Sequence, residues 1–277
     1  MFKDILVPLL AGEVHEAALA TACALAAHDG SHLVALVGVS VVTPSASAWA
    51  YYPAGVYETL NEAAQATAAA LAQAVEERLA REAVAREIRR SDSFWLTSAE
   101  LAAMHARYSD LVVLGLARPP QDADRRVFAG VLSGGGRAVL AVPAAAPAVA
   151  SYGHAVVAWK PSREAARAVH DALPLLQRAR SVDVVMIGPG TDHGARDELP
   201  GGDIATHLAR HGLVVNLVQR PRAAQATGES ILAHAQESRA DLIVAGGYSR
   251  ARALEQVFGG VTRHLLEHSS IPVLFSH

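Results

Sequence analysis

The sequence predicts an α/β protein built from two tandem Rossmann-like domains, each with a doubly wound, five-stranded parallel sheet. Short, almost fully apolar runs alternate with segments of helical periodicity along the 277 residues. Such runs are typical of parallel strands that helices cover on both faces. The pattern occurs twice, because "DLVVLGLA" (110–117) matches "DLIVAGGY" (241–248) in residue type at nearly every position. A repeat of this length indicates duplicated domains.

Two further pairs of matching runs place the domains at residues 1–145 and 152–277. "DILVPLL" (4–10) matches "HAVVAWK" (154–160), and "RAVLAVP" (137–143) matches "SIPVLFS" (270–276). Between the two copies, the proline- and alanine-rich stretch 142–153 is expected to form a semi-extended linker.

The periodicity predicts the elements in order. The expected strands are 4–9, 33–42, 84–89, 110–115 and 138–142 in the first half, and 154–159, 182–187, 213–218, 241–245 and 271–275 in the second. The expected helices are 14–28, 57–82, 97–107 and 124–133, then 162–179, 202–211, 227–239 and 253–268. In the helix 57–82, apolar residues recur every three or four positions from Leu60 to Leu79, which indicates one apolar stripe.

The last strand of each copy would lie at a sheet edge, and unpaired edges favour strand addition. We therefore expect the strands 138–142 and 271–275 to pair within the chain, and two chains to pair again as a homodimer.

Composition excludes several classes of partner. The net charge is −3 and no basic stripe is present, so a nucleic acid partner is not expected. The longest apolar strand-like run, 33–42, is too short for a bilayer, which needs about 20 residues, so no membrane association is expected. Cys23 is the single cysteine, which excludes an internal disulfide and zinc sites made of paired cysteines. Together with the lack of a signal peptide, this predicts a cytoplasmic location.

Topology places the candidate site in the second half. In doubly wound sheets, ligands bind beyond the carboxyl ends of the strands, where the strand order reverses. That point is bounded by Trp159, Lys160 and Ser162 after the first strand, and by Gly246 and Gly247 after the fourth. Glycine at such a place lets a ligand approach the backbone closely.

The stretch "GGYSRARALEQVFGGV" (246–261) has two interpretations. A helix that starts near Gly260 would present free N–H groups to an anion, and Arg250, Arg252 and Arg263 would add positive charge. Alternatively, the glycines only break and cap helices. Neither G-x-x-x-x-G-K-[ST] nor G-x-G-x-x-G occurs in the sequence.

With these residues, the architecture resembles the universal stress protein family in its tandem two-domain bacterial form. The family motif G-x2-G-x9-G-[ST] is similar to the frame of Gly246, Ser249, Gly259 and Gly260. "AWKPSREAARAVHDALPLL" (158–176) and the closing segment 259–277 resemble the corresponding segments of the tandem subgroup.

The resemblance implies a stress-response protein that binds ATP, ADP or AMP in its C-terminal domain and acts as a regulator without rapid turnover. The candidate nucleotide-binding residues are Trp159, Lys160, Ser162, Gly246, Gly247, Ser249, Arg250, Gly259, Gly260, Val261 and Thr262.

The sequence departs from the family pattern at several positions. Ser249 replaces a motif glycine, Gly260 replaces the motif Ser/Thr, and Lys160 stands where the family has an acid. In the first half, Leu10 stands at the position where the family has an acidic residue. Pro119 and Pro120 lie in the loop after the fourth strand, and prolines lack the backbone N–H donors that would bind a phosphate. Nucleotide binding is therefore expected in the second domain only.

Two other functions stay open: a nucleotide-free interaction scaffold that kept the fold, and a slow hydrolase. No G-x-S-x-G elbow is present, so no catalytic residue is assigned and the protein is not expected to be an enzyme. The thirteen histidines include the i,i+4 pairs His207/His211 and His264/His268, but a third zinc ligand is not evident and no metal is expected. The aromatic residues within 47–58 form either a packing loop or a lid over a ligand or partner.

Overall fold

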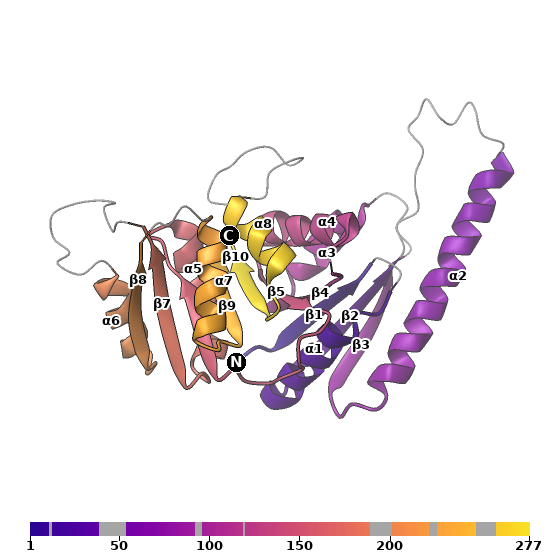
Figure 1. Cartoon of the computed structure of the whole chain (residues 1–277). Coiled ribbons are helices and arrows are strands. Elements are labelled where there is room, and N and C mark those ends of the chain that lie inside the picture. Colours follow the sequence, from indigo (N-terminus) through magenta and orange to yellow (C-terminus); the bar gives the residue numbers. More distant parts are fainter. Residues whose placement is uncertain are drawn as a thin grey trace.

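Ten strands form one sheet in the computed structural model, which describes residues 1–10, 13–38, 54–91, 96–118, 120–188, 201–221, 226–247 and 259–277. The strands are β1 (Asp4–Leu9), β2 (His32–Gly38), β3 (Ala85–Ser91), β4 (Leu111–Leu116), β5 (Ala138–Pro143), β6 (His154–Ala158), β7 (Ser181–Ile187), β8 (Val215–Arg220), β9 (Leu242–Gly246) and β10 (Val273–Ser276). Their order is β3-β2-β1-β4-β5-β10-β9-β6-β7-β8 (Figure 1).

Each half repeats one doubly wound arrangement, as the sequence predicts. Within a half, neighbouring strands are parallel and the order reverses at the first strand. The two halves meet where β5 and β10 pair antiparallel, with Val139 opposite Phe275 and Ala141 opposite Val273. The expected pairing of the two edge strands within the chain is confirmed, and β3 and β8 are left at the outer edges.

Helices cover both faces of the sheet in three layers (Figure 1). The helices are α1 (Glu16–Asp29), α2 (Ala54–Leu79), α3 (Ser98–Ala106), α4 (Asp122–Gly130), α5 (Arg163–Leu176), α6 (Gly202–Arg210), α7 (Thr227–Glu237) and α8 (Gly260–His268). Buried residues of α1, α2, α5 and α6 share one apolar core, and those of α3, α4, α7 and α8 share the other. Alternate residues of β1 face opposite cores, with Ile5 in the first and Leu6 in the second, as the pleat of a strand requires.

Side chains on both faces join the two halves. On one face the rings of Phe128 and Phe275 make an edge-to-face contact at 5.2 Å, and Arg125 Nη2 lies 3.0 Å from Glu267 Oε1. On the other face, Arg178 pairs with the buried carboxylate of Asp29. Apolar and charged side-chain contacts thus hold the two halves together on both faces of the sheet.

Several elements differ in detail from the expectation. The stripe of α2 is buried from Ala68 to Leu79, but Leu60 is 51% exposed because the start of α2 extends past the sheet (Figure 1). A π-helical turn, η1 (Val131–Gly135), follows α4 and was not expected. Residues 253–258 of the last expected helix, and 47–53 of the aromatic segment, lie outside the described residues.

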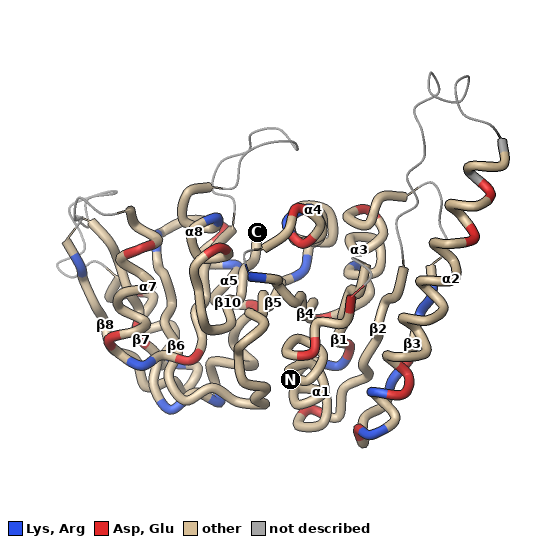
Figure 2. Tube along the Cα trace, turned by 45° about the vertical axis from the view of Figure 1, so that its right-hand side comes forward, with Lys and Arg blue, Asp and Glu red and all other residues tan. Residues whose placement is uncertain are grey.

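Charges of both signs are interspersed over the two halves (Figure 2). Among the described helices, none combines the length and the apolar character needed to cross a membrane.

Candidate functional site

The first side of the candidate site follows β6, at the carboxyl end of the C-terminal strands. The backbone N–H of Trp159 donates to Val185 O at 2.9 Å, and its half-buried side chain packs against the core. Ser162 caps α5, because its hydroxyl accepts from the N–H of Ala165 at 3.3 Å. Lys160 lies between them with its side chain exposed, so its charge is available to a ligand.

Gly246 and Gly247 follow the neighbouring strand β9, and both are used in packing. A Cβ on Gly246 would lie 2.7 Å from Ala165 N, so only glycine lets the start of α5 come this close. A Cβ on Gly247 would lie 2.5 Å from Leu132 Cδ2, which belongs to the first half. The N–H of Gly247 donates to Ser276 O at 2.8 Å, so this amide is already engaged.

The start of α8 is open, in contrast. Gly259 is the N-cap and Gly260 is the first helical residue; both are exposed, and a Cβ on either would meet no atom within 4 Å. The first bond of the helix runs from Arg263 N to Gly259 O. The amides of Gly260, Val261 and Thr262 therefore have no intrahelical acceptor, and no other described residue accepts from them. The side chain of Thr262 is buried.

The structure thus places five of the eleven predicted residues, those that follow β6 and β9, near the point where the strand order reverses. β6 and β9 pair directly, with Ala158 opposite Ala245, which brings the segment 159–162 beside Gly246 and Gly247. Ser249 and Arg250 lie outside the described residues.

Glu164 is a residue of this crevice that the sequence analysis missed. Its side chain is buried in the first turn of α5. Burial would raise the pKa of its carboxyl, but its own backbone N–H, the Ser162 hydroxyl and the charges of Arg163 and His277 together hold the pKa below its usual value. An ionised carboxylate therefore lies in the first turn of α5, whose backbone packs against Gly246. The available signal was an acid just after a serine N-cap, a position that a helix dipole favours.

His277 also reaches this crevice, with its Nδ1 3.0 Å from Gly247 O. Together with the bond from Gly247 N to Ser276 O, this contact closes the end of β9 against the last two residues of the chain.

The equivalent crevice of the first half is filled by its own side chains. His15 occupies the space over Gly115, where a Cβ would lie 2.2 Å from His15 Cβ. Asp124 is buried, and its Oδ2 accepts from the N–H groups of Ala117 at 3.3 Å and Gln121 at 3.1 Å. The Asp124 carboxylate thus accepts from backbone N–H groups that a phosphate would otherwise bind. A cavity lined in part by Leu10 and His15 has a volume of about 10 Å³, which is room for one water at most.

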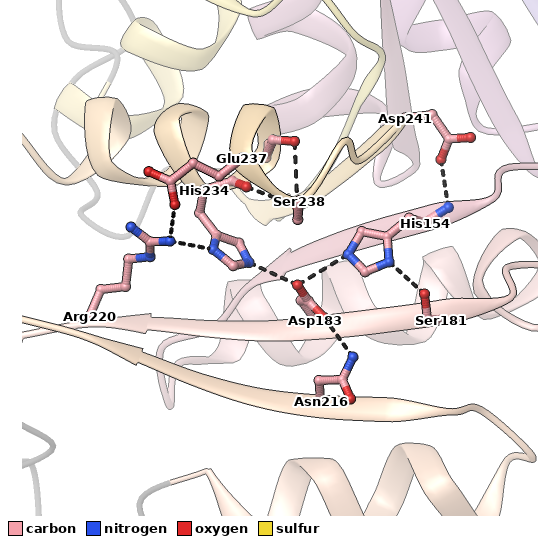
Figure 3. Close-up of polar contacts among 10 residues, drawn as sticks. His154, Ser181, Asp183, Asn216, Arg220, His234, Glu237, Ser238 and Asp241 are labelled. Carbon is pink, nitrogen blue, oxygen red and sulfur yellow. Dashed lines mark hydrogen bonds and ion pairs between the residues drawn. The ribbon is translucent and has the colours of Figure 1, made fainter.

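A polar network lies beneath α7 (Figure 3), and its members on β6 and β7 are near the amino ends of these strands. It consists of His154 of β6, Ser181 and Asp183 of β7, Asn216 and Arg220 of β8, and His234 and Glu237 of α7. None of these residues was singled out in the sequence, because they are far apart along the chain and only the strand register brings them together.

Asp183 is the centre of the network. His234 Nε2 lies 2.9 Å from Asp183 Oδ2, and Asn216 Nδ2 donates to Oδ1 at 3.0 Å. His154 Nε2 lies 3.1 Å from Oδ2 without the alignment of a hydrogen bond, so that contact is mainly electrostatic. Burial would raise the pKa of Asp183, but these three partners outweigh it and hold the pKa below its usual value.

Ser181, His154 and Asp183 resemble the parts of a nucleophilic triad, since Ser181 Oγ lies 2.5 Å from His154 Nδ1. Asp183 is nevertheless shared with His234 and Asn216, so its carboxylate is not reserved for His154. The arrangement accounts for the buried charge of Asp183 and ties three strands to α7.

The model of the universal stress protein family matches residues 151–277. This segment belongs to the universal stress protein family. None of the curated proteins compared with the chain matches it.

Solved structures share the fold of the whole chain, including the half that the family model does not match. A universal stress protein from Archaeoglobus fulgidus DSM 4304 is 13% identical with a TM-score of 0.65, over 99% of this chain and 95% of its own. A protein from Pseudomonas aeruginosa UCBPP-PA14 is 16% identical with a TM-score of 0.60, over 99% and 93%. The tandem arrangement of two universal stress protein folds therefore extends over the full length.

The histidine pairs do not assemble a metal site within the described part of the chain. His264 and His268 are stacked at 4.4 Å, and His207 and His211 meet edge to face at 4.8 Å. No group of three or more potential ligands is found among the described residues.

Proposed function

We propose that the C-terminal universal stress protein domain binds an adenine nucleotide, ATP, ADP or AMP, and acts in a stress response as a regulator without rapid turnover. The observation that carries the proposal is the open start of α8, where Gly259 and Gly260 are exposed and three consecutive amides lack an acceptor among the described residues. Such a helix start favours an anion through its N–H groups and its dipole.

The charges in the crevice indicate where the phosphates would lie. Ionised Glu164 beside Gly246 would repel them from the start of α5, whereas the exposed Lys160 would attract them. Because the amide of Gly247 is engaged with Ser276, the phosphates would rely on the amides of α8. The filled crevice of the first half favours one nucleotide per chain.

Calorimetric titration of the full chain with ATP, ADP and AMP tests this function. Gly259→Glu places a carboxylate at the proposed phosphate position and is expected to weaken binding by about tenfold or more, the usual scale for a lost charge-assisted bond. Gly259→Ala is the matched control, because Gly259 has a φ of −55° and open space around it, so a methyl group is tolerated. Equal affinity of the wild type and Gly259→Glu would refute the proposal.

An interaction scaffold without nucleotide is the second candidate. It is favoured by the packing roles of Gly246 and Gly247, which leave fewer free amides than a complete phosphate cradle needs. Chromatography of any ligand released from the purified, denatured protein separates the two candidates. Release of ADP from ATP, abolished by changing Lys160 or Arg250, would instead indicate a slow hydrolase.

We also infer a cytoplasmic homodimer. The outermost strands of the sheet are β3 and β8, and edge strands are the usual place for strand addition by a second chain. Light scattering after gel filtration measures the mass in solution.

A further inference from the structure

A cavity of about 260 Å³ lies at the junction of the two halves, apart from the α8 start. The first half contributes residues at the amino ends of its strands, and the second half contributes one side of α5. The ionisable residues that line it are Met1 with its amino group, Asp110, Arg137, Arg167, His170 and Asp171, and Phe2 forms an apolar part of the wall. A volume below the usual range of ligand pockets fits a ligand of few heavy atoms.

Two of the charges in the cavity neutralise each other. Arg167 Nε lies 3.0 and 3.2 Å from the two carboxylate oxygens of Asp171, and Arg167 Nη2 reaches Gly136 O. Asp171 also accepts from Ser276 Oγ at 2.6 Å. This pair therefore presents little net charge to a ligand.

Asp110 and Arg137 have opposite charges and remain without a charged partner among the described residues. Asp110 Oδ2 accepts from the backbone N–H groups of Lys3 at 2.6 Å and Asp4 at 3.1 Å. No side-chain cation of the described residues forms an ion pair with Asp110. Arg137 reaches only the backbone oxygen of Arg107, at 3.5 Å, and its Nε has no partner. The two side chains line the same cavity, yet they do not form an ion pair with each other.

We propose that this cavity binds a small zwitterion of the α-amino acid class, with its carboxylate on Arg137 and its ammonium on Asp110. A simple anion would meet Arg137 but would leave Asp110 without a counter-charge, and a simple cation would meet Asp110 but would leave Arg137 without one. A zwitterion satisfies both unpaired charges at once, and charge-assisted hydrogen bonds are stronger than bonds between neutral groups. The ligand would contact both halves and stabilise their junction.

Titration of the full chain with small amino acids tests the proposal. The probes are glycine, L-alanine and L-serine, with acetate and methylammonium as the two half-ligands, and binding is followed by calorimetry and by the shift in Tm. The amino acids are expected to bind saturably, and at concentrations at least about tenfold lower than either half-ligand. Absence of saturable amino acid binding, or equal binding of acetate, would overturn it.

Two variants and a matched control locate the site. Asp110→Asn removes the charge but keeps an oxygen for the amides of Lys3 and Asp4, and Arg137→Gln removes the other charge; each is expected to weaken amino acid binding by about tenfold. Asp241→Asn makes the same change at the equivalent position of the second half, away from the cavity, and is expected to leave binding unchanged. Equal weakening by Asp110→Asn and Asp241→Asn would show that the effect is structural.

Gly259→Glu separates this proposal from the nucleotide site. It is expected to leave amino acid affinity unchanged, since the cavity does not include α8. A loss of amino acid affinity in this variant would overturn the assignment to the cavity.

Discussion

Asp110 and Asp241 hold equivalent positions in the two halves, and each carboxylate accepts from two consecutive backbone N–H groups at the start of the first strand of its own half. Asp110 Oδ2 lies 2.6 and 3.1 Å from Lys3 N and Asp4 N. Asp241 Oδ2 and Oδ1 lie 2.6 and 2.9 Å from Gly153 N and His154 N. The duplication therefore extends from the strand order to individual polar contacts.

The first prediction concerns this contact. Asp241→Ala is expected to lower the free energy of unfolding by about 1–3 kcal/mol, because two backbone N–H groups lose their acceptor. Asp241→Asn is expected to lower it less, since the carboxamide oxygen can still accept. Urea unfolding at neutral pH measures both, and equal losses would show that the charge, not the acceptor, is what matters.

The sequence predicts those features of the fold that local patterns of residues encode, but not those that depend on how distant elements pack. The matching runs that begin at Asp110 and Asp241 predict the duplication, and apolar strand ends such as Val139 and Phe275 predict the pairing of the halves. The exposure of Leu60 could not be predicted, because the apolar stripe of α2 is longer than the sheet that it covers. The periodicity of a sequence shows which residues share one face of a helix, but it does not show where the sheet beneath that helix ends.

The candidate site is predicted less completely for the same reason. Topology places Gly246 beside the end of β6, but it does not reveal that the backbone of Ala165 fills the space a Cβ would need. The filling of the first crevice by His15 and Asp124 depends on tertiary contacts that no local motif encodes. Sequence thus locates the crevice, whereas packing decides how open it is.

The second prediction is a pH dependence of stability from Asp183. Its pKa in the folded protein is lower than its usual value, so its contribution to stability is fully present above that usual value and is lost as the pH falls through the folded pKa. Asp183→Asn is expected to be less stable at about pH 7, and its difference from the wild type is expected to shrink below about pH 4. Urea unfolding across this range measures the difference. A constant difference would show that Asp183 is not ionised in the fold.

The third prediction concerns the single thiol. Cys23 is 3% exposed in α1, and burial, with a smaller contribution from Glu82, raises its pKa to about 11. Because the thiolate is the reactive form, the folded protein is expected to react very slowly with an aromatic disulfide at about pH 8. In denaturant, one thiol per chain is expected to react rapidly. Fast reaction of the folded protein would contradict the buried position.

The fourth prediction compares the two glycines after β9. A Cβ on Gly246 would meet backbone atoms, Ala165 N and Glu164 C, each at 2.7 Å, and α5 cannot yield without moving its first turn. Gly246→Ala is therefore expected to lower the free energy of unfolding by about 1–3 kcal/mol, the usual cost of overpacking.

Gly247→Ala differs in what the added methyl group meets. The nearest atom is Leu132 Cδ2 at 2.5 Å, the end of a side chain that can rotate, and the next contacts lie at 3.6 Å. Its cost is expected to be smaller than that of Gly246→Ala, and Gly259→Ala, with no atom within 4 Å, is expected to be nearly neutral. Chemical unfolding of the three variants tests this order. A larger loss at Gly247 than at Gly246 would mean that the contact between the halves at Leu132 is more rigid than the start of α5.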